Sequence, residues 1–111
     1  MIDLAPAHLE IVRAILRERL PSVEVRAFGS RVTGKAKPHS DLDLAVAGEE
    51  PLADGVLLHL GIAFQESDLP FRVDVLEWRR MPDGLRKAIG NGYEIVQAGE
   101  PRPAETPSPA S

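Results

Sequence analysis

Three aspartates form the most chemically suggestive pattern in the chain. Asp41 and Asp43 flank Leu42, so on a β-strand both carboxylates project from one face while the leucine points to the other. Two carboxylates about 4 Å apart repel each other by roughly 4 kcal/mol at an effective dielectric constant near 20. Magnesium prefers hard oxygen ligands, and an ion between the two carboxylates would relieve this repulsion. The pair therefore predicts a magnesium site.

Asp74 is the third carboxylate, and it stands between Val73 and Val75 in an apolar stretch over residues 71–76. A carboxylate in such a strand is costly to bury unless it is paired or bound to a metal. If this strand lies beside the one that carries Asp43, all three carboxylates converge on one face. Two magnesium ions roughly 3.5–4 Å apart could then clamp an in-line phosphoryl displacement.

Gly29 and Ser30 stand where another apolar stretch ends. A glycine lets the backbone turn sharply, and the amides that follow such a turn can point together at a phosphate. Ser30 adds a hydroxyl at the same place, and Arg31 could either contact phosphate or brace the loop. A Gly-Ser pair is weak evidence alone, but it strengthens the case for a nucleotide site when three carboxylates accompany it.

Ordinary structural roles could also explain the three aspartates. The candidate roles are a turn cap for Asp41, an ion pair with Arg31 or Lys35 for Asp43, and an ion pair with Arg26 for Asp74. The charge pattern alone leaves these roles open beside the catalytic one. The conjunction of the carboxylates with Gly29-Ser30 favours the catalytic interpretation.

A P-loop is a second way to interpret the glycine-rich stretch. Residues 29–35 match the first seven positions of that motif, but Ala36 stands where Ser or Thr should hold magnesium. A P-loop also needs a long helix directly afterwards, and Lys37-Pro38 forbids one. We therefore reject a P-loop.

Hydrophobic periodicity predicts an α/β domain with a small sheet around these residues. The expected elements are a helix over 6–20, strands over 23–28, 42–46 and 71–76, helices over 51–66 and 82–89, and a short edge strand over 93–97. Residues 98–111 are rich in Pro, Ala and Ser and carry no large apolar side chain, so we expect a disordered tail. The folded domain should span residues 1–97.

Composition narrows the class of partner. The 111 residues carry a net charge of −4 and only one Trp, one Tyr and three Phe, so we expect no direct nucleic-acid binding. With no cysteine, the chain has no disulfide or thiolate metal site. No signal peptide and no apolar run of roughly 20 residues is present, so we expect a soluble, cytoplasmic protein without a membrane partner.

The motif as a whole resembles the DNA-polymerase-β-like nucleotidyltransferases. Gly29-Ser30, ten further residues and then Asp41-Leu42-Asp43 match their signature. Residues 28–45 are similar to the minimal nucleotidyltransferase (MNT) subgroup, and residues 67–78 resemble the segment that carries the third carboxylate there. The resemblance covers about residues 9–97. It implies a polymerase-β palm-like fold, with a mixed sheet of three to four strands and helices packed on one face.

The resemblance also implies a reaction and a partner. By this resemblance, Asp41 and Asp43 hold two Mg²⁺ ions, Asp74 holds the catalytic one and helps deprotonate the attacking hydroxyl, and Gly29 and Ser30 grip the triphosphate. MNT proteins are commonly paired with a separate helical HEPN-type protein, so the resemblance implies such a partner, encoded adjacently. In some pairs that protein is an RNase toxin, and the MNT protein acts as antitoxin by attaching AMP from ATP to a tyrosine.

Two other functions stay open at this point. The chain could be a binding module that neutralises a HEPN partner without catalysis. It could also be a small-molecule nucleotidyltransferase completed by a separate substrate-binding subunit. The short chain has no room for an acceptor-binding domain, so we expect the acceptor side of the site to come from another protein.

Overall fold

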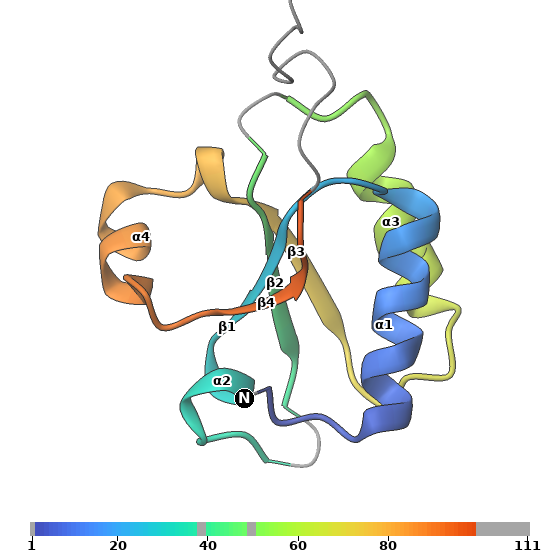
Figure 1. Cartoon of the computed structure of the whole chain (residues 1–111), viewed down its shortest axis with the longest axis horizontal. Coiled ribbons are helices and arrows are strands. Elements are labelled where there is room, and N and C mark those ends of the chain that lie inside the picture. Colours follow the sequence, from blue (N-terminus) through green and yellow to red (C-terminus); the bar gives the residue numbers. More distant parts are fainter. Residues whose placement is uncertain (1, 38–39, 49–50, 100–111) are drawn as a thin grey trace, which may run out of the picture.

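The computed structural model describes residues 2–37, 40–48 and 51–99. From residue 100 onward, the predicted disordered tail lies outside the described residues. Figure 1 shows a small sheet with helices around it. The elements in chain order are helix α1 (Pro6–Arg19), strand β1 (Val25–Phe28), helix α2 (Ser30–Thr33), strand β2 (Leu42–Val46), helix α3 (Val56–Gln65), strand β3 (Val73–Glu77), the 3-10 turn η1 (Trp78–Arg80), helix α4 (Asp83–Ile89) and strand β4 (Glu94–Gln97).

The sheet is mixed and four-stranded, in the order β3-β2-β1-β4. Strand β1 pairs antiparallel with both β2 and β4, whereas β2 and β3 run parallel. The parallel pair needs a crossover connection, and α3 supplies it. The predicted α/β class and mixed sheet are confirmed, and the predicted edge strand near residues 93–97 is β4.

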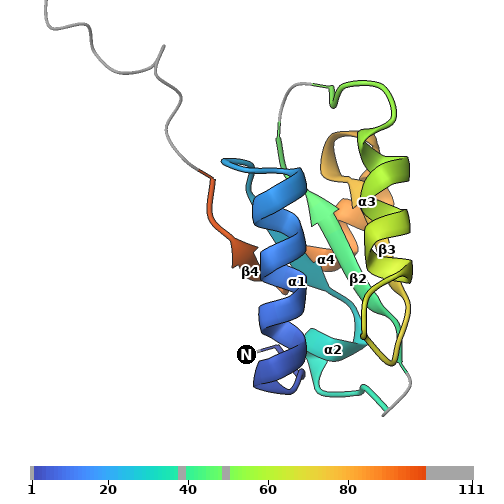
Figure 2. The same cartoon turned by 90° about the vertical axis from the view of Figure 1, so that its right-hand side faces the viewer.

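The two long helices, α1 and α3, cover one face of the sheet, as predicted (Figures 1 and 2). The core between them and the strands includes the buried residues Val12, Leu16, Leu42, Leu44, Leu60 and Phe64. Because side chains alternate along a strand, Asp43, which stands between Leu42 and Leu44, projects from the opposite face. That opposite face carries the candidate active-site residues.

The shorter α4 lies on the other side of the sheet from α1 and α3 (Figure 1). A second, smaller cluster of Phe28, Ala45, Met81, Trp78, Ile89 and Tyr93 packs there. Phe28 of this cluster is the register partner of Asp43, so the cluster borders the aspartates on the same face of the sheet. Trp78 therefore serves as a packing anchor beside β3.

Some boundaries differ from the predictions. Helix α3 begins at Val56 rather than at residue 51, and Leu52 reaches the core from the irregular segment before it. Helix α2 was not predicted, because a four-residue helix is too short to show a period. Within the described residues, no helix has both the length and the apolar character needed to cross a membrane.

Candidate active site

Two of the predicted carboxylates lie directly side by side. Asp43 on β2 is the register partner of Asp74 on the parallel β3. Leu42 and Leu44, which flank Asp43, are fully buried on the α1–α3 side, so both carboxylates project from the other face. The third strand does run beside the second, which was the condition for the aspartates to meet, and Asp43 and Asp74 lie side by side because of it.

The third carboxylate, Asp41, is exposed and directly precedes β2. Its charge still reaches the pair. Burial raises the pKa of Asp43 above its usual value, and the charges of Asp74 and then Asp41 raise the pKa further. All three negative charges therefore act on one site, which favours a cation or a proton there.

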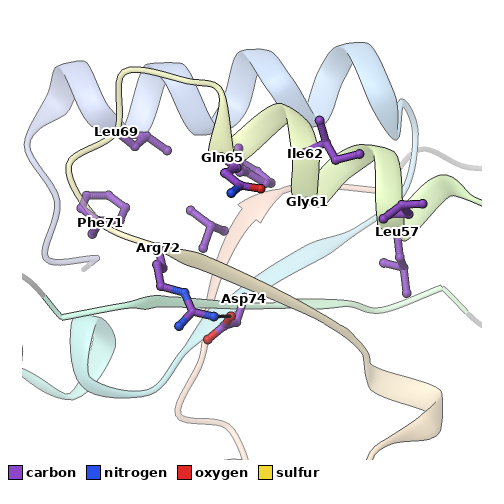
Figure 3. A pocket seen from close by; sticks show the side chains of 11 residues that line it. Leu57, Gly61, Ile62, Gln65, Leu69, Phe71, Arg72 and Asp74 are labelled. Atoms are coloured by element: carbon purple, nitrogen blue, oxygen red, sulfur yellow. Dashed lines mark ion pairs between the residues drawn. The ribbon is translucent and has the colours of Figure 1, made fainter.

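Asp74 is less buried than the sequence suggested, because β3 is an edge strand. Its side chain is 46% exposed, and its Oδ1 lies 3.7 Å from Nη2 of Arg72, whose side chain is 80% exposed (Figure 3). Such an exposed pair contributes little stability and breaks easily. Arg26, the partner considered from the sequence, instead forms an ion pair with Glu24 at 2.5 Å. Asp74 therefore remains accessible to a ligand.

Gly29 fits closely against Asp43. It directly follows β1, next to the Phe28–Asp43 register pair, and adopts φ +84°, which favours glycine. A Cβ atom at Gly29 would lie 2.5 Å from Oδ2 of Asp43. The missing side chain thus lets the carboxylate lie against the backbone. Ser30 follows at once as the first residue of α2, at the same end of the sheet.

We expect Gly29→Ala to disrupt the site far more than Gly34→Ala. Gly34 lies in the left-handed helical region, where an alanine costs about 1–2 kcal/mol of backbone strain, whereas Gly29 has φ +84° and ψ −156°, a conformation that essentially only glycine adopts. Only at Gly29 does the new methyl group collide with Asp43, since nothing lies within 4 Å of a Cβ atom at Gly34. Thermal unfolding and nucleotide transfer should be measured for both variants. Equal transfer rates would show that the contact between Gly29 and Asp43 is unimportant.

Arg31 braces the segments that carry the aspartates. It is only 7% exposed. Its Nε donates to the carbonyl of Ser40 at 3.0 Å, Nη1 donates to the carbonyl of Asp3 at 2.9 Å, and the guanidinium lies 4.3 Å from the Phe71 ring centre. Ser40 directly precedes Asp41, so these contacts hold the segment that leads into β2. The sequence left bracing and phosphate contact equally open, because a loop arginine gives no periodic signal of burial.

The donor set fits magnesium held jointly with a nucleotide. Among the side chains that the structure describes, no group of three His, Cys, Asp or Glu residues is placed so that it could hold a metal ion by itself. Magnesium usually binds through one or two carboxylates, with substrate phosphates and water completing its shell. The register pair of Asp43 and Asp74, with Asp41 near it, supplies such a partial set.

The raised pKa of Asp43 predicts a pH-dependent stability. In the unfolded chain its pKa is about 3.9. The folded state binds the proton more tightly, so the stabilising contribution of this proton is full below that value and is lost as the pH rises through the raised pKa.

Without metal, we therefore expect Asp43→Asn to raise Tm at pH 7 by roughly 2–4 °C. This corresponds to a gain of about 0.5 kcal/mol in the free energy of unfolding, as suits a partly solvated group. The gain should vanish near pH 3, where the wild-type carboxyl is already neutral. Calorimetry in chelator at both pH values tests this, with the exposed Asp54→Asn as the charge-matched control. A lower Tm for Asp43→Asn at pH 7 would refute the electrostatic account.

The fold is shared with solved toxin–antitoxin proteins. One is a toxin–antitoxin complex with AMP-PNP, matched with a TM-score of 0.66 and 22% identity over 83% of this chain and 74% of that chain. Another is the tri-AMPylated HEPN toxin of Shewanella oneidensis in complex with its MNT antitoxin. It matches with a TM-score of 0.61 and 19% identity, over 83% of this chain and 71% of that chain. At these identities, the likeness concerns the fold.

Comparison of the sequences identifies the family. The chain is 46% identical over 99 residues to the probable protein adenylyltransferase MntA of Haemophilus influenzae, covering 89% of this chain and 87% of that protein. The model of the nucleotidyltransferase domain family matches residues 9–96. The aspartates and Gly29-Ser30 all lie within that range. The chain therefore belongs to the nucleotidyltransferase domain family, as an enzyme similar to protein adenylyltransferases.

Proposed function

We propose that this enzyme transfers AMP from ATP onto a hydroxyl of a partner protein, with magnesium, and that it thereby acts as the antitoxin of a HEPN-type toxin. The observation that carries the proposal is the register pair of Asp43 and Asp74 on one accessible face. Gly29 lies against Asp43 of this pair, and the charge of Asp41 acts on Asp43 as well. A cluster of like charges is costly to keep unless it binds a cation.

The residues would divide the work as follows. Asp41 and Asp43 would hold two magnesium ions together with the triphosphate, and Asp74 would hold one of them. The ions would supply charge neutralisation at the phosphates. Gly29 and Ser30 would hold the β- and γ-phosphates. Arg31 would keep the segment before Asp41 in place.

The transfer is a substitution at the α-phosphorus of ATP. The acceptor oxygen forms a bond to the α-phosphorus of ATP, and the bond from that phosphorus to the bridging oxygen breaks. Pyrophosphate leaves with the bond electrons. The carboxylate of Asp74 takes the proton from the attacking hydroxyl and later passes it to water, as a general base within reach of the acceptor.

The choice of ATP and of a HEPN acceptor rests on the relatives. The Haemophilus influenzae relative is described as a probable protein adenylyltransferase. The Shewanella oneidensis complex contains an AMPylated HEPN toxin beside its MNT antitoxin. By analogy, we expect a helical HEPN-type acceptor encoded next to this chain, with tyrosine as the first candidate for the modified side chain.

Asp74→Ala separates this function from neutralisation by contact alone. In cells that co-express the HEPN-type protein, we expect the variant to lose protection, because the hydroxyl is no longer deprotonated and one ion loses a ligand. Asp68→Ala, which removes an exposed carboxylate in the loop before β3, should protect as the wild type does. Full protection by Asp74→Ala would instead support a binding module that needs no catalysis.

A further inference from the structure

An open hollow of about 580 Å³ runs between α3 and the outer edge of β3 (Figure 3). Leu58 and Ile62 of α3 line it, although they are 65% and 40% exposed. Phe71 lies toward one end, and Asp74 stands beside the strand at its rim. The hollow therefore combines apolar side chains of α3 with the polar side chains of Gln65, Arg72 and Asp74, and it is continuous with the candidate active site.

The edge of β3 offers unused main-chain hydrogen-bonding groups along this hollow. The amide of Leu42 on β2 donates to the carbonyl of Arg72 at 2.9 Å. In a parallel ladder, alternate residues face the neighbouring strand, so the amides and carbonyls of Asp74 and Leu76 face β2. Those of Val73 and Val75 then face outward, and within the described residues no main-chain partner for them is present.

Apolar side chains continue on the other face of the same edge. Leu76, two residues after Asp74, is a large exposed apolar residue on β3. With Leu85 of α4 it lines a second hollow of about 270 Å³. An edge strand with free main-chain groups and apolar surface on both faces is suited to receiving an added strand.

We propose that a segment of the acceptor protein binds here as an added β-strand along β3 and so presents its hydroxyl to Asp74. This inference rests on the proposed function and names how the acceptor docks. Neighbouring strands lie about 4.8 Å apart, and side chains opposite each other project from the same face. A residue opposite Asp74 therefore projects towards the aspartates, whereas its two neighbours project into the hollow beside α3.

The geometry also specifies the chemistry of the segment. The modified residue carries a hydroxyl, the residues on either side of it are apolar and meet Leu58 and Ile62, and the next residue on the hydroxyl's face is apolar and meets Leu76. A second copy of this chain fits the edge poorly. Its own β3 would bring a second Asp74 towards the first, and like charges on paired strands are destabilising.

Charge substitutions in the hollow test the proposal. Leu58→Glu and Ile62→Glu should each raise the KM for the HEPN-type acceptor protein by roughly tenfold or more, because an apolar contact becomes a charge. The kcat at saturating acceptor and the Kd for ATP should stay unchanged. The control is Ile95→Glu on β4, which is 50% exposed on the opposite edge of the sheet and should leave all three constants unchanged.

Hydrogen exchange of the wild-type complex gives an independent measurement. Binding of the acceptor should slow amide exchange in the peptide that contains Val73 and Val75, and not in the peptide that contains β4. The docking would be overturned if the wild type transfers AMP, both glutamate variants keep the wild-type KM and β3 gains no protection. The proposed function would then still stand. Absence of transfer by the wild type would overturn both. Protection of β3 without the acceptor, with dimers in light scattering, would assign the edge to a second copy.

Discussion

We expect Asp43→Asn to lower the rate of AMP transfer by at least about a thousandfold, which corresponds to roughly 4 kcal/mol of activation barrier. The amide keeps the size of the side chain but loses the negative charge that would hold magnesium. The fold should survive, because the substitution removes one of three mutually repelling charges. Transfer of labelled AMP to the acceptor protein, measured beside a thermal unfolding curve, tests both parts.

Control variants distinguish a loss of catalysis from a loss of the folded structure. Asp54→Asn makes the same charge change at an exposed position in the segment before α3, and it should transfer at the wild-type rate. Asp41→Asn should behave as Asp43→Asn does, and a metal chelator should reproduce both with the wild-type protein. Wild-type rates in Asp41→Asn or Asp43→Asn would show that the catalytic assignment of these carboxylates is wrong.

The second large effect is dependence on the acceptor. Orienting two reactants can contribute roughly 7–11 kcal/mol to a reaction barrier. The face with Asp43 and Asp74 is open at the β3 edge, and the groups that would orient a second substrate there are proposed to come from the acceptor protein. Alone, the chain should therefore transfer AMP to small alcohols or to itself only slowly.

Adding the HEPN-type protein should raise transfer by several orders of magnitude, with the label on a hydroxyl of that protein. Labelled ATP, with and without the partner, gives the comparison directly. An unrelated helical protein serves as control. Equally fast labelling of a small alcohol without any partner would point instead to a small-molecule nucleotidyltransferase.

Much of the fold could be predicted from local patterns. Period-two alternation at Leu42 and Leu44 located β2 and, with it, the face on which Asp43 projects. Helical spacing located α1, and its buried Val12 and Leu16 do face the sheet. These predictions were correct because burial on one side imposes a period on the sequence.

Features that depend on non-local contacts could not be predicted from such patterns. The exposure of Asp74 follows from the place of β3 at an edge, and strand order leaves no periodic trace. The burial of Arg31 depends on carbonyls from Asp3 and Ser40, which lie far from it or in an irregular segment. The short helix α2 and the contact of Gly29 with Asp43 likewise arise only when β1 and β2 pair.

Intact-mass spectrometry of the acceptor protein tests the central claim most directly. The HEPN-type protein would be incubated with this chain, ATP and magnesium, and separately with Asp74→Ala. The account predicts a gain of one or more adenylyl groups on a hydroxyl side chain with the wild type, and none with the variant or with chelator. An unmodified acceptor whose toxicity is nevertheless fully neutralised by the wild type would contradict it.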